Sequence, residues 1–121
     1  MLKRTYNCGQ LRIEDAGKRV VLCGWVDSYR DHGNLVFIDL RDREGITQLV
    51  FNPQSQPEVH KLARQLRCEY VIAASGIVGP RGQGLENPKL STGQIEVHID
   101  QLEILNTAET PIFELQNAGS V

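Results

Sequence analysis

Two turn signals on either side of a short alternating segment constrain the fold of this chain more than any other feature. Apolar residues alternate in direction from Leu35 to Leu40, a pattern typical of a strand with one face in a core. Asp-His-Gly-Asn at 31–34 precedes this segment, and Asp-Arg-Glu-Gly at 42–45 follows it. Together with the β-rich segments 18–26 and 46–51, this order predicts three consecutive antiparallel strands joined by turns.

The rest of the chain adds one helix and two strands. Pro57 and the apolar spacing that follows it predict a helix, carried by Val59, Leu62, Ala63 and Leu66. Segments 70–78 and 95–105 read as strands, separated by a Gly- and Pro-rich loop. The apolar residues of the last strand change parity, which predicts a bulge or bend near Asp100 and Gln101. The resulting β-β-β-α-β-β order is that of the oligonucleotide- and oligosaccharide-binding (OB) fold, an all-β, five-stranded Greek-key barrel with its helix between strands three and four.

We expect one folded domain at residues 1–106, with 1–17 as a lead-in segment and 107–121 as a linker or tail. The net charge of −2 argues against binding nucleic acid through bulk electrostatics. Residues 1–82, however, hold 12 of the 13 Lys and Arg residues and 9 of the 15 Asp and Glu residues. Contact with RNA is therefore expected on the N-terminal two-thirds of the chain, through a few placed side chains.

The cysteines and the histidines suggest no metal or cofactor. Cys8, Cys23 and Cys68 are odd in number and form no C-x-x-C pair, so neither a disulfide framework nor a zinc site is indicated. No apolar run approaches the ~18 residues of a membrane span, and the N-terminus lacks the apolar core of a signal peptide. These observations predict a cytoplasmic protein with no membrane partner.

Three side chains along the first strands point to single-stranded nucleic acid. Arg30, Phe37 and Gln48 supply a cation, a ring and an amide, which suit phosphate contact, base stacking and reading of base edges. The face of strands two and three is also the usual binding surface of an OB barrel. Trp25 is assigned to the core, and the charges of segment 39–44 to turns and local ion pairs.

The string from Gly24 to Gln48 closely resembles the N-terminal anticodon-binding domain of bacterial-type aspartyl-tRNA synthetases, which are class II aminoacyl-tRNA synthetases. The family writes this region as G-W-V, then R-D-x-G, then F-x-D-L-R-D-R-x-G-x-x-Q. The matching residues here are Gly24-Trp25-Val26, Arg30-Asp31-His32-Gly33 and the segment from Phe37 to Gln48. Further agreement lies in Cys8-Gly9-Gln10-Leu11, in Asn87-Pro88 with Thr92-Gly93-x-Ile95-Glu96-Val97, and in Thr110-Pro111-Ile112-Phe113.

The resemblance implies a role for each matched residue. Phe37 would stack on an anticodon base, Gln48 would hydrogen-bond in the anticodon loop, and Arg30 would contact bases or the adjacent phosphates. Glu96 would accept hydrogen bonds from the first anticodon base, a guanine or its modified form. Asn87, in the loop before the last strand, is a weaker candidate.

Two departures from the family pattern bear on this interface. Ser28 and Tyr29 stand where the family has two more arginines, so the chain either binds more weakly or uses Tyr29 for stacking. His32 occupies a position where relatives carry His or Leu. In this family the His form accompanies relaxed reading of the third anticodon base, which lets the enzyme also charge the asparagine tRNA.

The resemblance therefore implies a module that binds the anticodon stem-loop of aspartate tRNA for an aspartate–tRNA ligase, and that of asparagine tRNA where reading is relaxed. The class II catalytic motifs are absent, so this chain alone is expected not to be an enzyme and to need no cofactor; ATP and Mg would belong to a catalytic domain. The parent would be a homodimer and the isolated domain a monomer. The residues alone leave two alternatives open: a freestanding OB-fold protein that binds single strands generally, and a protein-assembly module.

Overall fold

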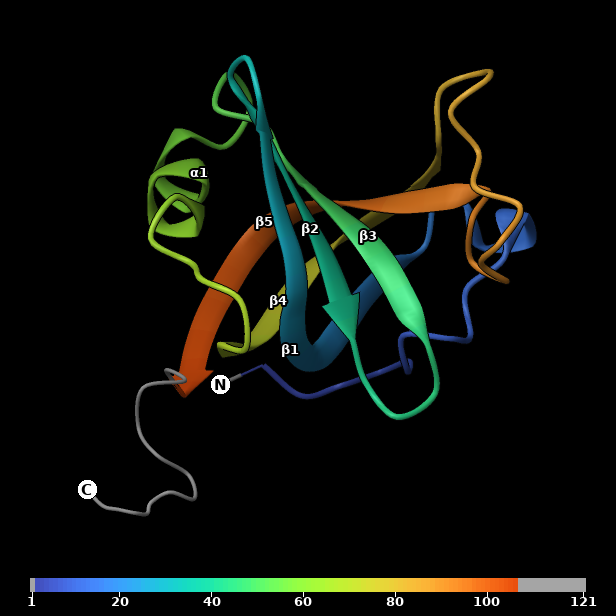
Figure 1. Cartoon of the computed structure of the whole chain (residues 1–121), viewed down its shortest axis with the longest axis horizontal. Coiled ribbons are helices and arrows are strands. Elements are labelled where there is room, and N and C mark those ends of the chain that lie inside the picture. The colour runs from blue at the N-terminus through green and yellow to red at the C-terminus, as the bar shows by residue number, and fades with distance from the viewer. Residues whose placement is uncertain (1, 107–121) are drawn as a thin grey trace.

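A computed structural model describes residues 2–106 and shows a closed five-stranded barrel (Figure 1). The strands are β1 (Arg19–His32), β2 (Leu35–Arg41), β3 (Ile46–Phe51), β4 (Val71–Pro80) and β5 (Ile95–Asn106). The helix α1 (Pro57–Ala63) lies between β3 and β4, and a 3-10 turn, Ile13–Asp15, precedes β1. The predicted order and fold class are confirmed. The expected linker or tail at 107–121 lies outside the described residues.

The strands follow the order β1-β2-β3-β5-β4 around the barrel. All neighbouring pairs are antiparallel except β3 and β5, which are parallel, with Leu49 opposite Val97 and Val50 opposite His98. This single parallel pair matters for the surface, because it sets β5 beside β3. Residues that are 48 positions apart in sequence, Gln48 and Glu96, become neighbours across the sheet.

The core fills the barrel with aliphatic side chains from every strand. On β2 the predicted alternation is confirmed, since Val36, Ile38 and Leu40 are fully buried and the residues between them are half-buried. Ala63 and Leu66, in α1 and just after it, belong to the same core. Fully burying one such aliphatic side chain stabilises the fold by about 1.5–3 kcal/mol. The helix is therefore held against the barrel mainly by its apolar side.

A β-bulge in β1 decides which residues face outward near the β1–β2 turn. The pairing with β2 shifts between Val26 and Ser28, so that Arg30 lies opposite Phe37 and Tyr29 opposite Ile38. A one-residue shift moves every later side chain to the other face of the strand. Val26 points into the core, and without the bulge Arg30 would share its direction. The bulge therefore brings Arg30 to the outer face, with Phe37.

The predicted core position of Trp25 is wrong. Its side chain is half-buried and is absent from the core cluster, whereas its neighbour Val26 is fully buried. The two residues point to opposite faces of β1 because they are adjacent in an extended strand. The aromatic ring therefore lies on the outer side of the barrel.

The predicted irregularity in the last strand is confirmed. Ser75 pairs with Gln101 and Gly76 pairs with Ile99, which leaves Asp100 as an extra residue in β5. The Asp100 carboxylate accepts two hydrogen bonds from the Arg19 guanidinium, at 3.0 Å and 2.7 Å. This bidentate contact lowers the pKa of Asp100, an effect that partial burial opposes.

Candidate nucleic-acid interface

A row of hydrogen-bonded side chains crosses the outer face of four strands, in the order β1, β2, β3 and β5. Arg30 donates to Asp39 at 2.8 Å and to Gln48 at 3.0 Å. Gln48 in turn donates to Glu96 at 2.9 Å. The structure thus brings together three residues that the sequence predicted for RNA binding, Arg30, Gln48 and Glu96, and adds Asp39 to them. We call this row the polar row.

Gln48 stands at the centre of the polar row and is only 9% exposed. Its amide oxygen accepts from Arg30 and its amide nitrogen donates to Glu96, so both ends of the amide have a fixed partner. An amide oxygen has a second lone pair, and the amide nitrogen has a second proton. Gln48 is therefore held in one orientation, with one amide proton and one oxygen lone pair unused among the described residues.

Hydrogen bonds to Ser28 and Asp39 fix the position of the Arg30 guanidinium. The Ser28 hydroxyl donates to Asp39 at 2.7 Å and accepts from Arg30 at 2.9 Å. Burial raises the pKa of the Asp39 carboxyl, but the hydrogen bonds from Arg30 and Ser28 outweigh it, so that the pKa is lowered overall. Asp39 is therefore a carboxylate at neutral pH. Ser28, which stands where the family has an arginine, serves here to hold the neighbouring Arg30.

A pocket of about 260 Å³ adjoins the polar row, and the loop between β4 and β5 forms its far side. Its lining residues are Arg30, His32, Phe37, Gln48, Arg81 and Leu85. The Phe37 and His32 rings meet edge to face, with centroids 5.9 Å apart and an interplanar angle of 86°. Leu85 is 69% exposed on the loop. An aromatic ring, an exposed aliphatic side chain and two guanidinium groups around one hollow suit a base with its phosphate.

Arg81 is a charged residue of this pocket that was not among the residues predicted from the sequence. Its Nε donates to the carbonyl oxygen of Ile95 at 3.1 Å, while one terminal nitrogen is buried without a partner among the described residues. Burial lowers the pKa of Arg81, and the Asp39 and Glu96 carboxylates oppose that shift. Its only signal in the sequence is a single cation beside a glycine-rich stretch.

Two of the predicted site residues lie apart from the polar row. Tyr29 packs against the hydrophobic core, because the bulge in β1 turns it to the side of Ile38. Asn87 sits in the β4–β5 loop, where its side-chain oxygen accepts from the backbone N–H of Lys89 at 3.0 Å. Both residues hold local structure here, and neither lines the pocket beside Phe37.

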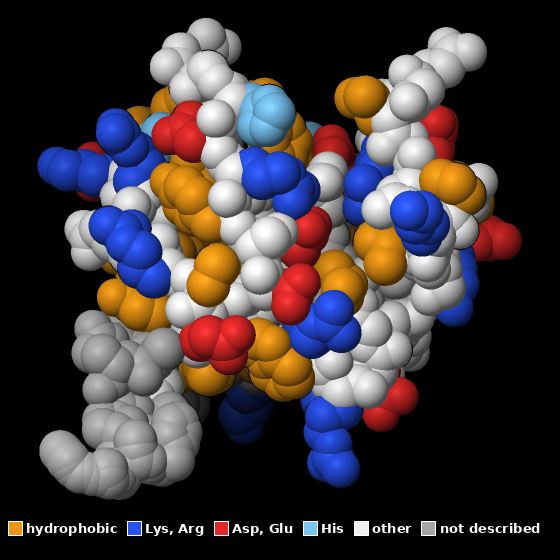
Figure 2. Space-filling view, in the orientation of Figure 1, with side chains coloured by type: hydrophobic (Ala, Val, Ile, Leu, Met, Phe, Trp, Pro, Cys, Tyr) orange, Lys and Arg blue, Asp and Glu red, His pale blue; other side chains and the backbone are white. Residues whose placement is uncertain are grey.

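Asp42, just after β2, has the structural role predicted for most of the charges of segment 39–44. The Asp42 carboxylate accepts from the backbone N–H groups of Glu44, Gly45 and Cys8, which fixes the β2–β3 turn against the N-terminal segment. Figure 2 shows Lys and Arg side chains interspersed with Asp and Glu over the visible face of the molecule. The visible face therefore carries individually placed charges of both signs and no broad positive field.

Within residues 2–106, no group of side chains is arranged to hold a metal ion. Over the same residues, no helix has the length and apolar character needed to cross a bilayer.

The sequence profile of the tRNA anticodon-binding family, described as an OB-fold nucleic acid binding domain, matches residues 20–105. The chain belongs to this family. Among curated proteins, it is 53% identical to an aspartate–tRNA(Asp/Asn) ligase of Desulfatibacillum aliphaticivorans and 56% identical to one of Desulfotalea psychrophila. Each comparison covers 99% of this chain and 20% of the relative. The chain thus corresponds to the anticodon-binding OB-fold domain of aspartyl-tRNA synthetase homologues and spans about a fifth of their length.

Solved structures agree with this assignment. The asparaginyl-tRNA synthetase of Pyrococcus horikoshii, complexed with asparaginyl-adenylate, superposes with a TM-score of 0.73 and is 31% identical. That comparison covers 94% of this chain and 25% of the synthetase. An OBody bound to hen egg-white lysozyme superposes with a TM-score of 0.78 at 25% identity, covering 89% of this chain and 98% of the OBody.

Proposed function

We propose that this chain binds the anticodon loop of aspartate tRNA, as the tRNA-recognition part of an aspartate–tRNA ligase. The observation that carries the proposal is the convergence of Arg30, Phe37, Gln48 and Glu96 on one outer face. Arg30, Phe37 and Gln48 were predicted as RNA contacts from their residue types and positions, and Glu96 from the family resemblance. The family assignment to an anticodon-binding domain supports the same partner.

The face offers two kinds of contact to unpaired bases. Phe37 is half-buried and its ring meets the His32 ring in an edge-to-face contact, so it is fixed as a platform on which a base can stack. Stacking of this kind is worth about 1–3 kcal/mol per base and discriminates little between bases. The remaining donor and acceptor of Gln48 and the oxygens of Glu96 then select base edges. Arg30 and Arg81 compensate the negative charge of the phosphates.

The activity of the whole ligase is a further proposal, because the chain spans only about 20% of its curated relatives. ATP, Mg, the aminoacylation reaction and the homodimer contact would all belong to the rest of such a protein. The whole ligase would act in the cytoplasm. This domain contributes differential binding of one anticodon over others and performs no bond chemistry of its own.

An anticodon stem-loop titration tests the proposal. We expect the stem-loop with the aspartate anticodon to bind about tenfold more tightly than one with a changed middle base, the scale of one good edge contact. Fluorescence anisotropy at fixed salt measures both affinities, since the salt concentration sets the phosphate contribution. Equal affinities would favour a freestanding, sequence-blind OB protein. An unstructured oligonucleotide of the same sequence is the matched control for loop shape.

We also propose that His32 relaxes reading of the third anticodon base. The support is its position against Phe37 in the lining of the pocket, together with relatives that are named as Asp/Asn ligases. His32→Leu should shift the affinity ratio of two stem-loops that differ only in the third base by about threefold or more, the scale of one polar contact. An unchanged ratio would rule out this role for His32.

A further inference from the structure

His98 contacts the end of the polar row and is absent from the residues assigned above. It occupies the next outward position of β5 after Glu96, because Val97 between them points into the core. Its Nε2 lies 3.3 Å from Oε2 of Glu96, while Oε1 of Glu96 accepts from Gln48 at 2.9 Å. Each oxygen of the carboxylate therefore has its own partner, one from β3 and one from β5.

The consequence follows from the acceptor capacity of a carboxylate. Each oxygen has two lone pairs, so one donor on each oxygen leaves one lone pair per oxygen unused. Two free acceptor sites on one carboxylate match two adjacent N–H groups on a Watson–Crick edge such as that of guanine. We propose that His98 is a positioning residue, which together with Gln48 holds Glu96 in the orientation that accepts both N–H groups of a guanine edge. This inference rests on the proposed anticodon function.

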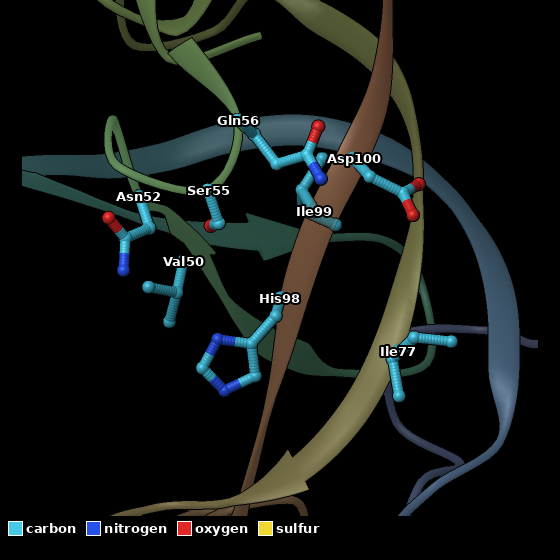
Figure 3. Close-up of a pocket in the computed structure, with 8 residues that line it drawn as sticks. All are labelled: Val50, Asn52, Ser55, Gln56, Ile77, His98, Ile99 and Asp100. Atoms are coloured by element: carbon cyan, nitrogen blue, oxygen red, sulfur yellow. The ribbon is translucent and has the colours of Figure 1, made fainter.

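The lack of a side chain at Gly79 leaves room for the His98 ring against β4. The ring lies over Gly79 of β4, where an added Cβ would come within 3.3 Å of two ring atoms, Cδ2 and Nε2. Figure 3 shows the imidazole extending from β5 beside a pocket of about 180 Å³. The residues that line this pocket with His98 are Val50, Asn52, Ser55, Gln56, Ile77, Ile99 and Asp100. The ring is thus supported on one side by β4, and the pocket beside it is lined by neutral groups except for Asp100.

The charged groups around His98 favour its protonated form. Glu96 is the near carboxylate on β5, and Asp100 on the same strand is already engaged by Arg19 of β1. β3 and β4 carry no charged side chain, and Arg81 follows β4 in the loop. The hydrogen bond to Glu96 raises the pKa of His98, against the opposing effect of partial burial.

Protonation matters because it fixes the donor. In imidazolium both nitrogens carry a proton, whereas neutral histidine has one tautomer with a lone pair at Nε2 facing the carboxylate. The charge balance works in the same direction. Arg30 and Arg81 are opposed by Asp39 and Glu96, so a protonated His98 makes this part of the face net positive toward phosphates. This charge acts on any loop, whereas the fixed donor acts only where Glu96 accepts two N–H groups. The affinity should therefore fall as the pH rises through the raised pKa, and should fall more for a guanine loop than for an adenine loop.

Two variants separate the donor from the ring. His98→Phe keeps a flat ring over Gly79 and removes the donor, whereas His98→Gln keeps a neutral donor and removes the titration. The wild-type 121-residue chain and each variant are titrated with aspartate stem-loops that carry guanine, inosine or adenine at the first anticodon position. Inosine lacks the 2-amino group of guanine, so it offers Glu96 one N–H group where guanine offers two. Adenine has no proton on N1, so the adenine stem-loop lacks the N1–H donor. Thermal unfolding of each variant checks that the barrel is intact.

We expect the preference of the wild type for guanine over inosine to fall about fivefold in His98→Phe and less in His98→Gln. Between about pH 6 and 8.5, wild-type affinity for the guanine loop should fall several-fold while His98→Gln stays flat. NMR titration of the free protein should show a lower pKa for His98 after Glu96→Gln. This last measurement does not depend on RNA.

The outcomes distinguish this inference from the function on which it rests. A wild type that binds no stem-loop, or binds all of them equally, overturns both. A wild type that discriminates anticodons while His98→Phe keeps the full guanine preference overturns the positioning role alone. A pH effect of equal size on the adenine loop would also overturn it, because it would make His98 only a cation near phosphate.

Discussion

Phe37→Ala should weaken binding of the aspartate anticodon stem-loop by about thirtyfold, or ~2 kcal/mol, while the barrel stays folded. The ring lies on the outer face of β2 opposite Arg30, meets the His32 ring edge to face, and is not part of the barrel core. Removing it therefore deletes a stacking platform and leaves the buried alternation of Val36 and Ile38 intact. Anisotropy titration measures the affinity, and the thermal unfolding midpoint reports on the fold.

Two further variants make this result specific. Phe37→Tyr keeps a ring of the same shape and should bind within about threefold of the wild type. Leu35→Ala removes an apolar side chain from the same face of β2, outside the pocket that Phe37 lines, and should leave RNA affinity unchanged. If Phe37→Ala bound RNA as tightly as the wild type, the face would be better explained as a surface for packing on another protein.

The strands of this domain were predictable because their signals are local. Val36, Ile38 and Leu40 alternate with residues of the opposite face, and the period of two alone assigns them to one side. The parity change around Asp100 is equally visible in the sequence, and the pairing of Ser75 and Gly76 with β5 confirms it. Each of these features depends only on residues close together in the chain.

The direction of Arg30 was not predictable in the same way. It depends on the bulge between Val26 and Ser28, which is defined by the register of β1 against β2. The turn between these strands left the register open, so no pattern within β1 could show that Tyr29 faces inward. Trp25 was assigned to the wrong face for the related reason that hydrophobic character alone does not fix parity.

The polar row itself needed the tertiary structure. Gln48 reaches Glu96 only because β3 and β5 pair in parallel, across an intervening helix and strand. From the sequence, Ser28 was interpreted as the loss of a positive charge that the family has at this position. In the structure its hydroxyl holds Arg30 on Asp39. Arg81 carried no motif, and only its burial beside the pocket distinguishes it from a surface arginine.

The close approach of β4 and β5 at Gly76 gives the largest stability effect that we expect. A Cβ at this position would overlap the carbonyl oxygen of His98 and would lie 2.8 Å from the Cα of Ile99. Both are backbone atoms, so no side-chain rotation relieves the clash. Gly76 is also paired with Val20 on its other side, and the closed barrel leaves β4 no free edge toward which to move.

Gly76→Ala should therefore lower the free energy of unfolding by about 3 kcal/mol or more, a large share of the ~5–15 kcal/mol of a typical domain. The thermal midpoint should fall by roughly 15 °C. Gly82→Ala is the matched control, because its Cβ would meet only the flexible Leu85 side chain, and its effect should stay within ~0.5 kcal/mol. A midpoint for Gly76→Ala close to that of Gly82→Ala would contradict the close approach of the two strands. Because His98 supplies the clashing carbonyl, RNA affinity should fall together with stability in Gly76→Ala, whereas Phe37→Ala should separate the two.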